Sequence, residues 1–527
     1  MMSILENELE KRRTFAIISH PDAGKTTVTE KLLYLGGAIN TAGTVKARKS
    51  ARHATSDWME IEKQRGISVT SSVMQFEYKG HVINLLDTPG HEDFSEDTYR
   101  TLSAVDSALM IIDAARGVED RTIKLLEVCR LRKTPVVTFV NKLDRYGRAP
   151  LELLDEIESV LDIACAPITW PIGSGQHFEG LYNFNSKALL PYVKGDTDNQ
   201  WIGLEQGSVD KRFEKGFSDL MDEVELLEGA GNSFTPELFL SGAVTPVFFG
   251  SALRTFGLKE MLDTFVDIAP RPLARETTTS SIEPSESSFS AFVFKVQANM
   301  DPNHRDRIAF LRICSGKYYN GMQCHNVRLK RKMKLGGAIQ FMAQTREATG
   351  HAFPGDIIGI HNHGTIQIGD TFTEGENFMF SGIPSFAPEL FRRVRSLDPL
   401  RNKALLKGLQ QLCEEGAAQV FDYKNRGDLV VGAIGMLQFE VVAWRLQYEY
   451  SVECIFEAVP IKAARWLESN EPKEIEKLER HSPSNVALDG AGKLVYLAPS
   501  LANLQVTIDR CPRVTFRATR EMLAQAV

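Results

Sequence analysis

The sequence predicts a multidomain α/β protein in which a doubly wound α/β domain is followed by a β-barrel domain and a C-terminal α+β domain. The chain of 527 residues is too long for one hydrophobic core and corresponds to roughly three to five domains. Short apolar runs alternate with helical patterns over its first part, which is typical of a parallel sheet covered by helices. After a polar stretch at 276–288, short strands separated by turn residues follow.

The composition excludes several classes of protein. Apolar residues make up 43% and charged residues 24% of the chain, as in folded globular proteins and unlike disordered or fibrous ones. Because the formal net charge is −7, any contact with nucleic acid must come from local basic patches. Seven scattered cysteines without a CxxC pair argue against a disulfide framework or a structural zinc site. Residues 1–13 lack the apolar run of a signal peptide and no long uncharged apolar stretch occurs, so we expect a cytoplasmic protein.

The first domain is expected to span residues 1–275. Four apolar runs predict its buried strands: Phe15–Ser19, Val82–Leu86, Ala108–Asp113 and Pro135–Val140. Helical spacing between them predicts helices over Lys25–Leu35 and Arg121–Leu131. A stretch from about 170 to 245, which contains much Gly, Asp and Asn, breaks this alternation. We interpret it as an insertion before a last strand, Pro246–Gly250.

The segment 276–288 contains mainly Thr, Ser, Glu and Pro, a composition typical of a solvated linker. The β-barrel domain is expected at 289–386, with short strands at Phe289–Val296, Arg307–Ile313, His325–Leu329 and Asp356–Ile360. The C-terminal α+β domain is expected at 387–527. It begins with Leu405, Leu406, Leu409 and Leu412 on one helical face, followed by a strand (Asp428–Ile434), a helix (Gln438–Leu446) and a strand (Ser451–Phe456).

A phosphate-binding loop is predicted where the first strand meets the first helix. It occupies consecutive positions: Ser19, His20, Pro21, Asp22, Ala23, Gly24, Lys25, Thr26 and Thr27. In such a loop, backbone N–H groups and the helix N-terminus point at the phosphates, the Lys25 ammonium reaches the β and γ oxygens, and the Thr26 hydroxyl reaches Mg²⁺. Ser19 stands where the pattern usually has Gly, and a chance Gly-Lys-Thr turn is the alternative interpretation.

A second motif follows the strand Val82–Leu86 and contains Asp87, Thr88, Pro89, Gly90 and His91. It places a carboxylate at the C-terminal edge of a strand, where ligands bind in α/β sheets. Asp87 is predicted to hold the Mg²⁺ shell through water. Gly90 offers an N–H to the γ-phosphate and allows the segment to move when that phosphate leaves. The alternative is an ordinary turn at the end of a strand.

Two further strand ends are predicted to recognise a base. One carries Asn141, Lys142, Leu143 and Asp144, and the other carries Ser251, Ala252 and Leu253. Asp144 can accept hydrogen bonds from guanine N1–H and the exocyclic amine, while Asn141 and the Ser251–Ala252 backbone hold the other edge and the loops. Adenine would leave Asp144 unpaired, a mismatch that costs about 10⁴-fold in sites built around hydrogen bonds. The sequence therefore predicts guanine nucleotides, GTP and GDP.

A mobile switch is predicted between the first two motifs, at Gln64–Val69, after a polar stretch without clear periodicity. Ser68 can donate its hydroxyl oxygen to the metal, so the loop would order only when the γ-phosphate is present. The alternative is the start of a surface strand. Together these motifs indicate a P-loop GTPase G domain with an insertion.

With these motifs, the first 270 residues resemble the G domain of the translational GTPases, and the later domains continue the likeness. Three segments look like those of the bacterial class II peptide chain release factors: Ile168–Gly173, His361–Asp370 and Phe386–Arg393. The resemblance implies a ribosome-dependent GTPase that acts after peptide hydrolysis and promotes dissociation of the class I release factors. Its partners would be the ribosome and those factors, without membrane or DNA.

The resemblance also implies roles for individual residues. His91 matches the histidine that positions or polarises the attacking water, Lys25 the phosphate ligand, and Asp22 a P-loop carboxylate near the phosphates. Thr26, Ser68 and Asp87 match the metal ligands. Ser68 stands where the elongation factors carry Thr, so it lacks the methyl group that stiffens χ1, and its switch would order less tightly.

Two other features have a structural alternative. His361 and His363 alternate as strand residues do, but without a third ligand they are more typical of a barrel surface than of a metal site. The basic runs at 328–334 and 392–395 suit rRNA phosphates or merely a solvated face.

Three rival functions remain open. These are a translational GTPase with another task, a P-loop phosphotransferase, and a GTP-sensing module without meaningful turnover. The Asn-Lys-x-Asp motif disfavours an ATP kinase, and His91 beside Gly90 favours water as the acceptor.

Overall fold

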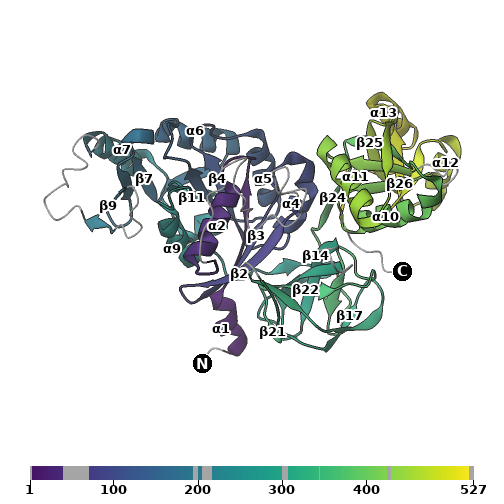
Figure 1. Cartoon of the computed structure of the whole chain (residues 1–527), viewed down its shortest axis with the longest axis horizontal. Coiled ribbons are helices and arrows are strands. Elements are labelled where there is room, and N and C mark those ends of the chain that lie inside the picture. The colour runs from purple at the N-terminus through teal and green to yellow at the C-terminus, as the bar shows by residue number, and fades with distance from the viewer. Residues whose placement is uncertain are drawn as a thin grey trace.

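The computed structural model describes residues 3–39, 70–193, 200–203, 217–298, 307–342, 345–423 and 429–521. Figure 1 shows an α/β unit at the left, a β-rich unit below it, and a third unit at the upper right. The predicted fold class, a multidomain α/β protein with β-rich and C-terminal α+β parts, is confirmed. None of the helices in these ranges is long and apolar enough to cross a membrane.

The α/β unit is built on one run of strands in the spatial order β2-β3-β1-β4-β5-β11-β6. Their bounds are Ser72–Tyr78 (β2), His81–Asp87 (β3), Arg12–Ser19 (β1), Ser107–Asp113 (β4), Val136–Asn141 (β5), Val244–Phe249 (β11) and Ala164–Pro167 (β6). Strand β2 pairs antiparallel with β3, and the other neighbours pair parallel. Each of the five strands predicted for this domain overlaps one of these. The carboxyl ends of the parallel strands therefore meet at one edge of the sheet.

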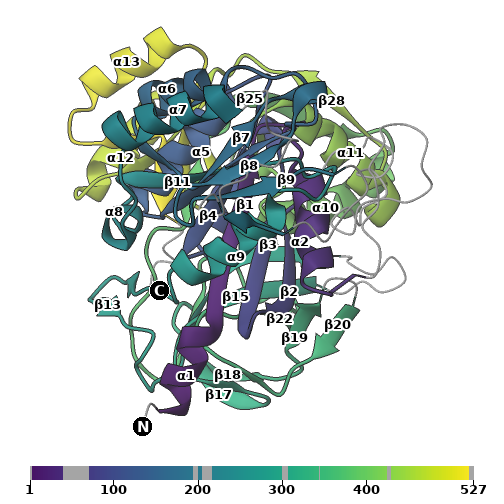
Figure 2. The same ribbon diagram turned by 90° about the vertical axis from the view of Figure 1, so that its left-hand side faces the viewer.

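Helices cover both faces of this sheet (Figure 2). Phe15 and Ile17 of β1 pack on the side of α2 (Lys25–Leu35) and α9 (Leu258–Ile268), whereas Ala16 and Ile18 pack on the side of α5 (Asp120–Leu131) and α6 (Pro150–Leu161). This alternation follows from the two-residue period of a strand, and it explains why β1 is apolar on both faces. The predicted helices at Lys25 and Arg121 are confirmed, the second beginning one residue earlier.

Three shorter helices complete the unit: α1 (Ile4–Lys11), η1 (Glu92–Phe94) and α4 (Ser95–Leu102).

The predicted insertion contains a second, antiparallel sheet in the order β10-β9-β8-β7. Its strands are β7 (Thr169–Ile172), β8 (Gly180–Asn183), β9 (Ala188–Pro191) and β10 (Ile202–Gly203), and the helices α7 (Phe217–Ala230) and α8 (Pro236–Leu240) follow. Trp170 anchors it, because its ring is fully buried and its Nε1 donates to Glu223 Oε2 at 2.7 Å.

The segment 276–288 contains two short strands, β12 (Arg275–Glu276) and β13 (Ser281–Ile282), which pair with each other. The strands of the β-rich unit are β14 (Ser290–Ala298), β15 (Arg307–Ser315), β16 (Tyr318–Tyr319), β17 (Met322–Asn326), β18 (Arg331–Leu335), β19 (Ile339–Met342), β20 (Thr345–Ala348), β21 (His351–Ala352), β22 (Ile357–His361) and β23 (Thr371–Thr373). They enclose an apolar core of their own.

The predicted strand His325–Leu329 is wrong in its second half. The chain turns after Asn326, whose side-chain Oδ1 accepts a hydrogen bond from Leu329 N–H at 2.9 Å, and Lys330 takes a left-handed φ of 48°. An Asn side chain that bonds the backbone two or three residues on is a turn former, and it overrides the apolar spacing here.

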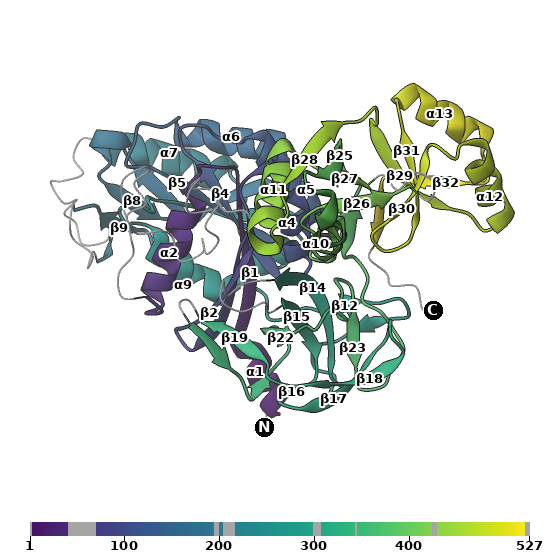
Figure 3. The same ribbon diagram turned by 45° about the vertical axis from the view of Figure 1, so that its right-hand side comes forward.

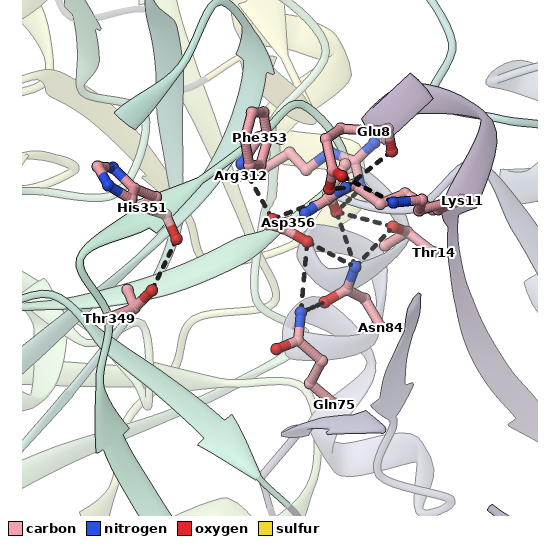
Figure 4. Close-up of polar contacts among 12 residues, drawn as sticks. Glu8, Lys11, Thr14, Gln75, Asn84, Arg312, Thr349, His351, Phe353 and Asp356 are labelled. Carbon is pink, nitrogen blue, oxygen red and sulfur yellow. Dashed lines mark hydrogen bonds and ion pairs between the residues drawn. The ribbon is translucent and has the colours of Figure 1, made fainter. Parts of the chain in front are cut away.

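The β-rich unit is joined to the first sheet by strand pairing and by a buried polar network. Met342 of β19 pairs with Gln75 of β2, so the two units share one continuous sheet. Asp356, which is fully buried, forms an ion pair with Arg12 Nε at 2.9 Å and accepts hydrogen bonds from Gln75 and Asn84, both at 3.3 Å (Figure 4).

The third unit contains an eight-stranded sheet in the order β28-β25-β27-β26-β30-β31-β29-β32. Its elements are β25 (Leu390–Ser396), η5 (Pro399–Arg401), α10 (Asn402–Glu414), β26 (Gln419–Asp422), β27 (Leu429–Ala433), α11 (Met436–Tyr450), β28 (Cys454–Ala458), β29 (Ala463–Glu468), α12 (Pro472–His481), β30 (Val486–Asp489), β31 (Leu494–Ala498), α13 (Leu501–Arg510) and β32 (Thr515–Arg517). A separate pair is formed by β24 (Pro384–Phe386) and β33 (Thr519–Glu521). Figure 3 shows α10 and α11 on the side of the α/β unit, and α11 contacts η1.

The strand predicted at Ser451–Phe456 begins later, at Cys454. Ser451 ends α11 with a left-handed φ of 56°, and Val452 N–H donates back to Leu446 C=O at 2.9 Å. Such a C-terminal cap satisfies a helix carbonyl and delays the strand.

Candidate functional site

The predicted phosphate-binding loop lies between β1 and α2 and bends sharply. Asp22 and Gly24 have φ values of 66° and 99°, in the left-handed region that favours glycine. A Cβ on Gly24 would lie 2.4 Å from Asn141 Nδ2, so close approach also requires glycine here. The first turn of α2 leaves its backbone N–H groups without acceptors in the helix, and such groups bind phosphate.

Lys25 and Asp87 meet at the centre of the site. Lys25 Nζ lies 2.5 Å from Asp87 Oδ1, and both residues are buried. The second carboxylate oxygen, Asp87 Oδ2, is buried without a hydrogen-bond partner, and so is Ser19 Oγ. Because an unsatisfied buried carboxylate oxygen is costly, it fits a cation or a metal-bound water. Thr26, the other described candidate for Mg²⁺, is half-buried beside Lys25, whereas Ser68 lies outside the described residues.

Asn141 connects three loops. Its Nδ2 donates to Ala23 C=O at 2.9 Å, and its Oδ1 accepts from the N–H groups of Lys142 at 2.8 Å and Ala252 at 2.9 Å. These bonds use both polar atoms of the side chain. The prediction gave Asn141 two tasks, holding the base and holding the loops, and its contacts within the chain serve the second.

Asp144 is oriented by Ser251, whose Oγ donates to Asp144 Oδ1 at 2.5 Å. The two predicted base-recognition loops therefore touch each other. Leu143 and Ala252 are buried beneath them, and Leu253 is exposed.

Lys142 forms an ion pair that the sequence analysis missed. Its Nζ lies 2.7 Å from Asp113 Oδ2 and also contacts the Asp22 carbonyl oxygen. Burial raises the pKa of Asp113, but the hydrogen bond and charge of Lys142 and the N–H of Ala115 outweigh it, so this pKa lies below its ordinary value. Asp113 ends β4 at the same sheet edge as the predicted motifs, and that position is a signal that could have identified it.

The sequence analysis also missed a second pair, which links the phosphate-binding loop to the residue before α5. His20 Nε2 lies 3.0 Å from Glu119 Oε2, just before α5. Thr88 Oγ1 donates to Ile17 C=O at 2.6 Å, which fixes the end of β3 against β1. Pro89 is buried next to it.

His91 lies at the rim of the site. A Cβ on the preceding Gly90 would lie 3.5 Å from Pro21 Cα, so the two motifs are in contact. The His91 side chain is 41% exposed, and its Nδ1 lies 3.3 Å from Asp93 Oδ1. Asp93 in turn accepts a hydrogen bond from Leu437 N–H in the third unit at 2.6 Å. No sequence signal links residues so far apart in the chain.

The remaining candidates lie elsewhere. His361 and His363 are exposed, and no group of three or more His, Cys, Asp or Glu side chains within the described ranges could hold a metal ion. Within the basic runs, Arg328 pairs with Asp370 at 2.5 Å, and Arg395 lies 3.6 Å from Glu457. Part of this positive charge is therefore balanced inside the β-rich and third units.

Comparison with known proteins covers most of the chain. Residues 10–271 match the family "Elongation factor Tu GTP binding domain", and residues 288–375 match "Elongation factor G domain 2". Residues 380–508 match "Class II release factor RF3, C-terminal domain".

A solved crystal structure of a protein from Thermus thermophilus is similar with a TM-score of 0.68 and 23% identity, over 88% of this chain and 71% of that one. At this identity the likeness concerns the fold alone. The three family matches follow one another along the chain, and the nucleotide motifs lie within the first of them. The chain therefore belongs to the translational GTPases, among the class II release factors.

Proposed function

We propose that this chain is a ribosome-dependent GTPase of translation termination that promotes dissociation of class I peptide chain release factors after peptide release. The observation that carries the proposal is the release-factor match at 380–508 behind a G domain in the same chain. The proposed partners are the ribosome and the class I factors, and the proposed compartment is the cytoplasm. The proposed boundaries are 1–275 for the G domain, 289–386 for the β-rich domain and 387–527 for the C-terminal domain.

In this proposal the buried half of the site binds the nucleotide. Lys25 exchanges its contact with Asp87 for the β- and γ-phosphate oxygens, and Asp144 accepts from the guanine ring. Thr26, Ser68 and Asp87 would hold Mg²⁺, which neutralises phosphate charge when bound. The unpartnered Asp87 Oδ2 supports this assignment.

The exposed half of the site would act in hydrolysis. His91 orients the attacking water, and Gly90 offers its N–H to the γ-phosphate. Asp22 is exposed in the loop, where its carboxylate can approach the phosphates. Water rather than a second substrate is the acceptor in this proposal, because His91 directly follows Gly90, the residue that would meet the γ-phosphate.

The test is GTP turnover with and without ribosomes, followed by a chase of labelled class I factor from a terminated complex. We expect ribosomes to stimulate turnover and the chain to release the factor. His91→Ala should keep GTP affinity and lose about 10²-fold or more of the stimulated turnover, because a positioning group is removed. Equal turnover with and without ribosomes, or a factor that stays bound, would refute the proposal.

A further inference from the structure

The side chain of Asp93 touches two distant parts of the molecule. Its Oδ2 accepts a hydrogen bond from Leu437 N–H at 2.6 Å, and its Oδ1 lies 3.3 Å from His91 Nδ1. Leu437 belongs to the first turn of α11 and follows Asp93 by 344 residues. The carboxylate is largely buried, with 13% of the side chain exposed. It therefore connects His91 to the third unit.

The start of α11 takes its side-chain acceptor from this contact. Its N-cap, Gly435, makes no side-chain cap, and its first turn contains no acidic residue. Asp93 supplies from another unit the acceptor and the negative charge that helices normally find at their own N-terminus.

Gly435 itself indicates that the contact is built into the fold. Its backbone is extended, with a φ of −140°, so any residue could adopt it. A Cβ at this position would nevertheless lie 1.9 Å from Asp93 Oδ1. A side chain at this position would therefore displace the Asp93 carboxylate, although the backbone conformation itself does not call for glycine.

His91 Nδ1 has two alternative partners within Asp93. The Asp93 N–H can donate to Nδ1 at 3.3 Å, which places the proton of a neutral ring on Nε2. A protonated Nδ1 can instead donate to Asp93 Oδ1, which leaves Nε2 as an acceptor. The position of the Asp93 carboxylate therefore decides whether Nε2 carries the proton and donates, or lacks it and accepts.

We propose that Asp93 is a positioning residue for His91, and that the N-terminus of α11 fixes the Asp93 carboxylate for this role. The inference rests on the proposed part of His91 in hydrolysis. Because the α11 N–H groups attract the carboxylate, docking of the third unit sets the rotamer of Asp93. Through Asp93 it sets the orientation and tautomer of the His91 ring.

Two substitutions test this link from opposite ends. Asp93→Asn keeps the shape and can still accept from α11, but its amide group donates to Nδ1 instead of accepting from it. Gly435→Ala leaves the Asp93 and His91 side chains chemically unchanged, and its added methyl group displaces the Asp93 carboxylate by crowding alone.

Two matched controls make the same substitutions elsewhere in the chain. Asp398→Asn alters another aspartate that caps a helix start, where Asp398 Oδ1 accepts from Leu400 N–H at 2.9 Å. Gly229→Ala adds a methyl group in α7 with no atom within 4 Å. Thermal unfolding of all four variants checks that each is folded. If Gly435→Ala does not fold, the result for Asp93→Asn decides the proposal.

The first readout is the ¹⁵N NMR spectrum of the full chain labelled with ¹⁵N-histidine, in which the Nδ1 and Nε2 shifts report the tautomer. The His91 signals are assigned by their loss in His91→Ala. We expect both test variants to change the His91 ring shifts, with the Nε2–H form gaining in Asp93→Asn, and both controls to leave them unchanged. Unchanged His91 shifts in a folded test variant would overturn the proposal.

The second readout is ribosome-stimulated GTP turnover. Both test variants should lower kcat by about tenfold with GTP affinity unchanged, because a positioning contact and not a binding contact is lost. A matching loss of GTP affinity would overturn the proposal by placing Asp93 in nucleotide binding. If ribosomes do not stimulate the native chain, the proposed function fails, whereas the NMR result, recorded without ribosomes, still decides whether Asp93 and α11 set the His91 ring.

Discussion

Asn141→Ala should loosen all three nucleotide loops at once and weaken binding of GTP and GDP equally. The residue is 2% exposed and makes three hydrogen bonds to backbone groups, at distances of 2.8 to 2.9 Å. These groups belong to the phosphate loop, to the Asn-Lys-x-Asp loop itself and to the Ser251 loop. Removing the side chain leaves one carbonyl and two N–H groups in buried surroundings without their partner.

The size of the effect follows from these bonds. A hydrogen bond of this kind contributes about 1 kcal/mol net, so three contribute about 3 kcal/mol. If the nucleotide must reorder the loops of the variant when it binds, this free energy reduces the binding free energy of the nucleotide. Because about 1.4 kcal/mol corresponds to a tenfold change, affinity should fall on the order of 100-fold.

The assay is equilibrium binding of fluorescent GDP and GTP, with guanine and xanthine nucleotides as competitors. Asp144→Asn is the matched control, because it replaces a predicted base contact without touching the Asn141 bonds, and its amide oxygen can still accept from Ser251 Oγ. It should shift preference toward xanthine. Asn141→Ala should lower affinity for every nucleotide by a similar factor. An affinity loss below about threefold, or a changed base preference in Asn141→Ala, would refute the reasoning, since Asn141 would then contact the base and not hold the loops.

Three further outcomes are expected. Lys25→Ala should abolish tight binding of GDP and GTP alike in the same assay, because the lost charge faces the β-phosphate in both; a defect confined to turnover would contradict this. Asp356→Ala removes one of the two carboxylates that pair with the buried Arg12 cation, the other being Glu8, so the first unfolding transition in urea should lose about 1–3 kcal/mol, and a loss below about 0.5 kcal/mol would contradict it. Since the pKa of Asp113 is lowered in the folded chain, its pair with Lys142 stabilises the fold above the ordinary aspartate pKa of about 4 and is lost as pH falls through the lowered value. Asp113→Asn should therefore flatten the acid limb of a stability–pH curve, and an unchanged limb would show that the pair does not contribute.

The sequence predicted those parts of the fold and of the site that local patterns encode. The strands β1, β3, β4 and β5 are short apolar runs whose ends carry the polar motifs, so periodicity and spacing located both. The rule that ligands bind at the carboxyl ends of parallel strands then predicted that the motifs carrying Lys25 and Asp87 lie at one edge of the sheet, and the structure shows the two side chains in contact there.

What the sequence did not predict depends on contacts between distant residues. Asn141 was predicted as a site residue, but the hydrogen bonds by which it joins the loops depend on a side-chain geometry that no spacing encodes. The Asp356–Arg12 and Asp93–Leu437 contacts connect different units, and single polar residues in loops carry no periodic signal. The turn after Asn326 was missed for a local reason, because the apolar pattern was given more weight than the Asn side chain.

The contrast in burial between the two halves of the site bears on why a partner would be needed. Lys25 and Asp87 are buried and paired at the sheet edge, so the half of the site that is proposed to bind the nucleotide is already formed within the chain. His91, by contrast, is 41% exposed, and its polar and ring contacts among the described residues are with its own neighbours Asp93 and Phe94. Fixing a solvated ring in one orientation costs conformational entropy, and water weakens the electrostatic effect of the ring on a reacting group. A surface that covers His91 would remove both penalties at once, and the ribosome dependence proposed above would require a surface of this kind.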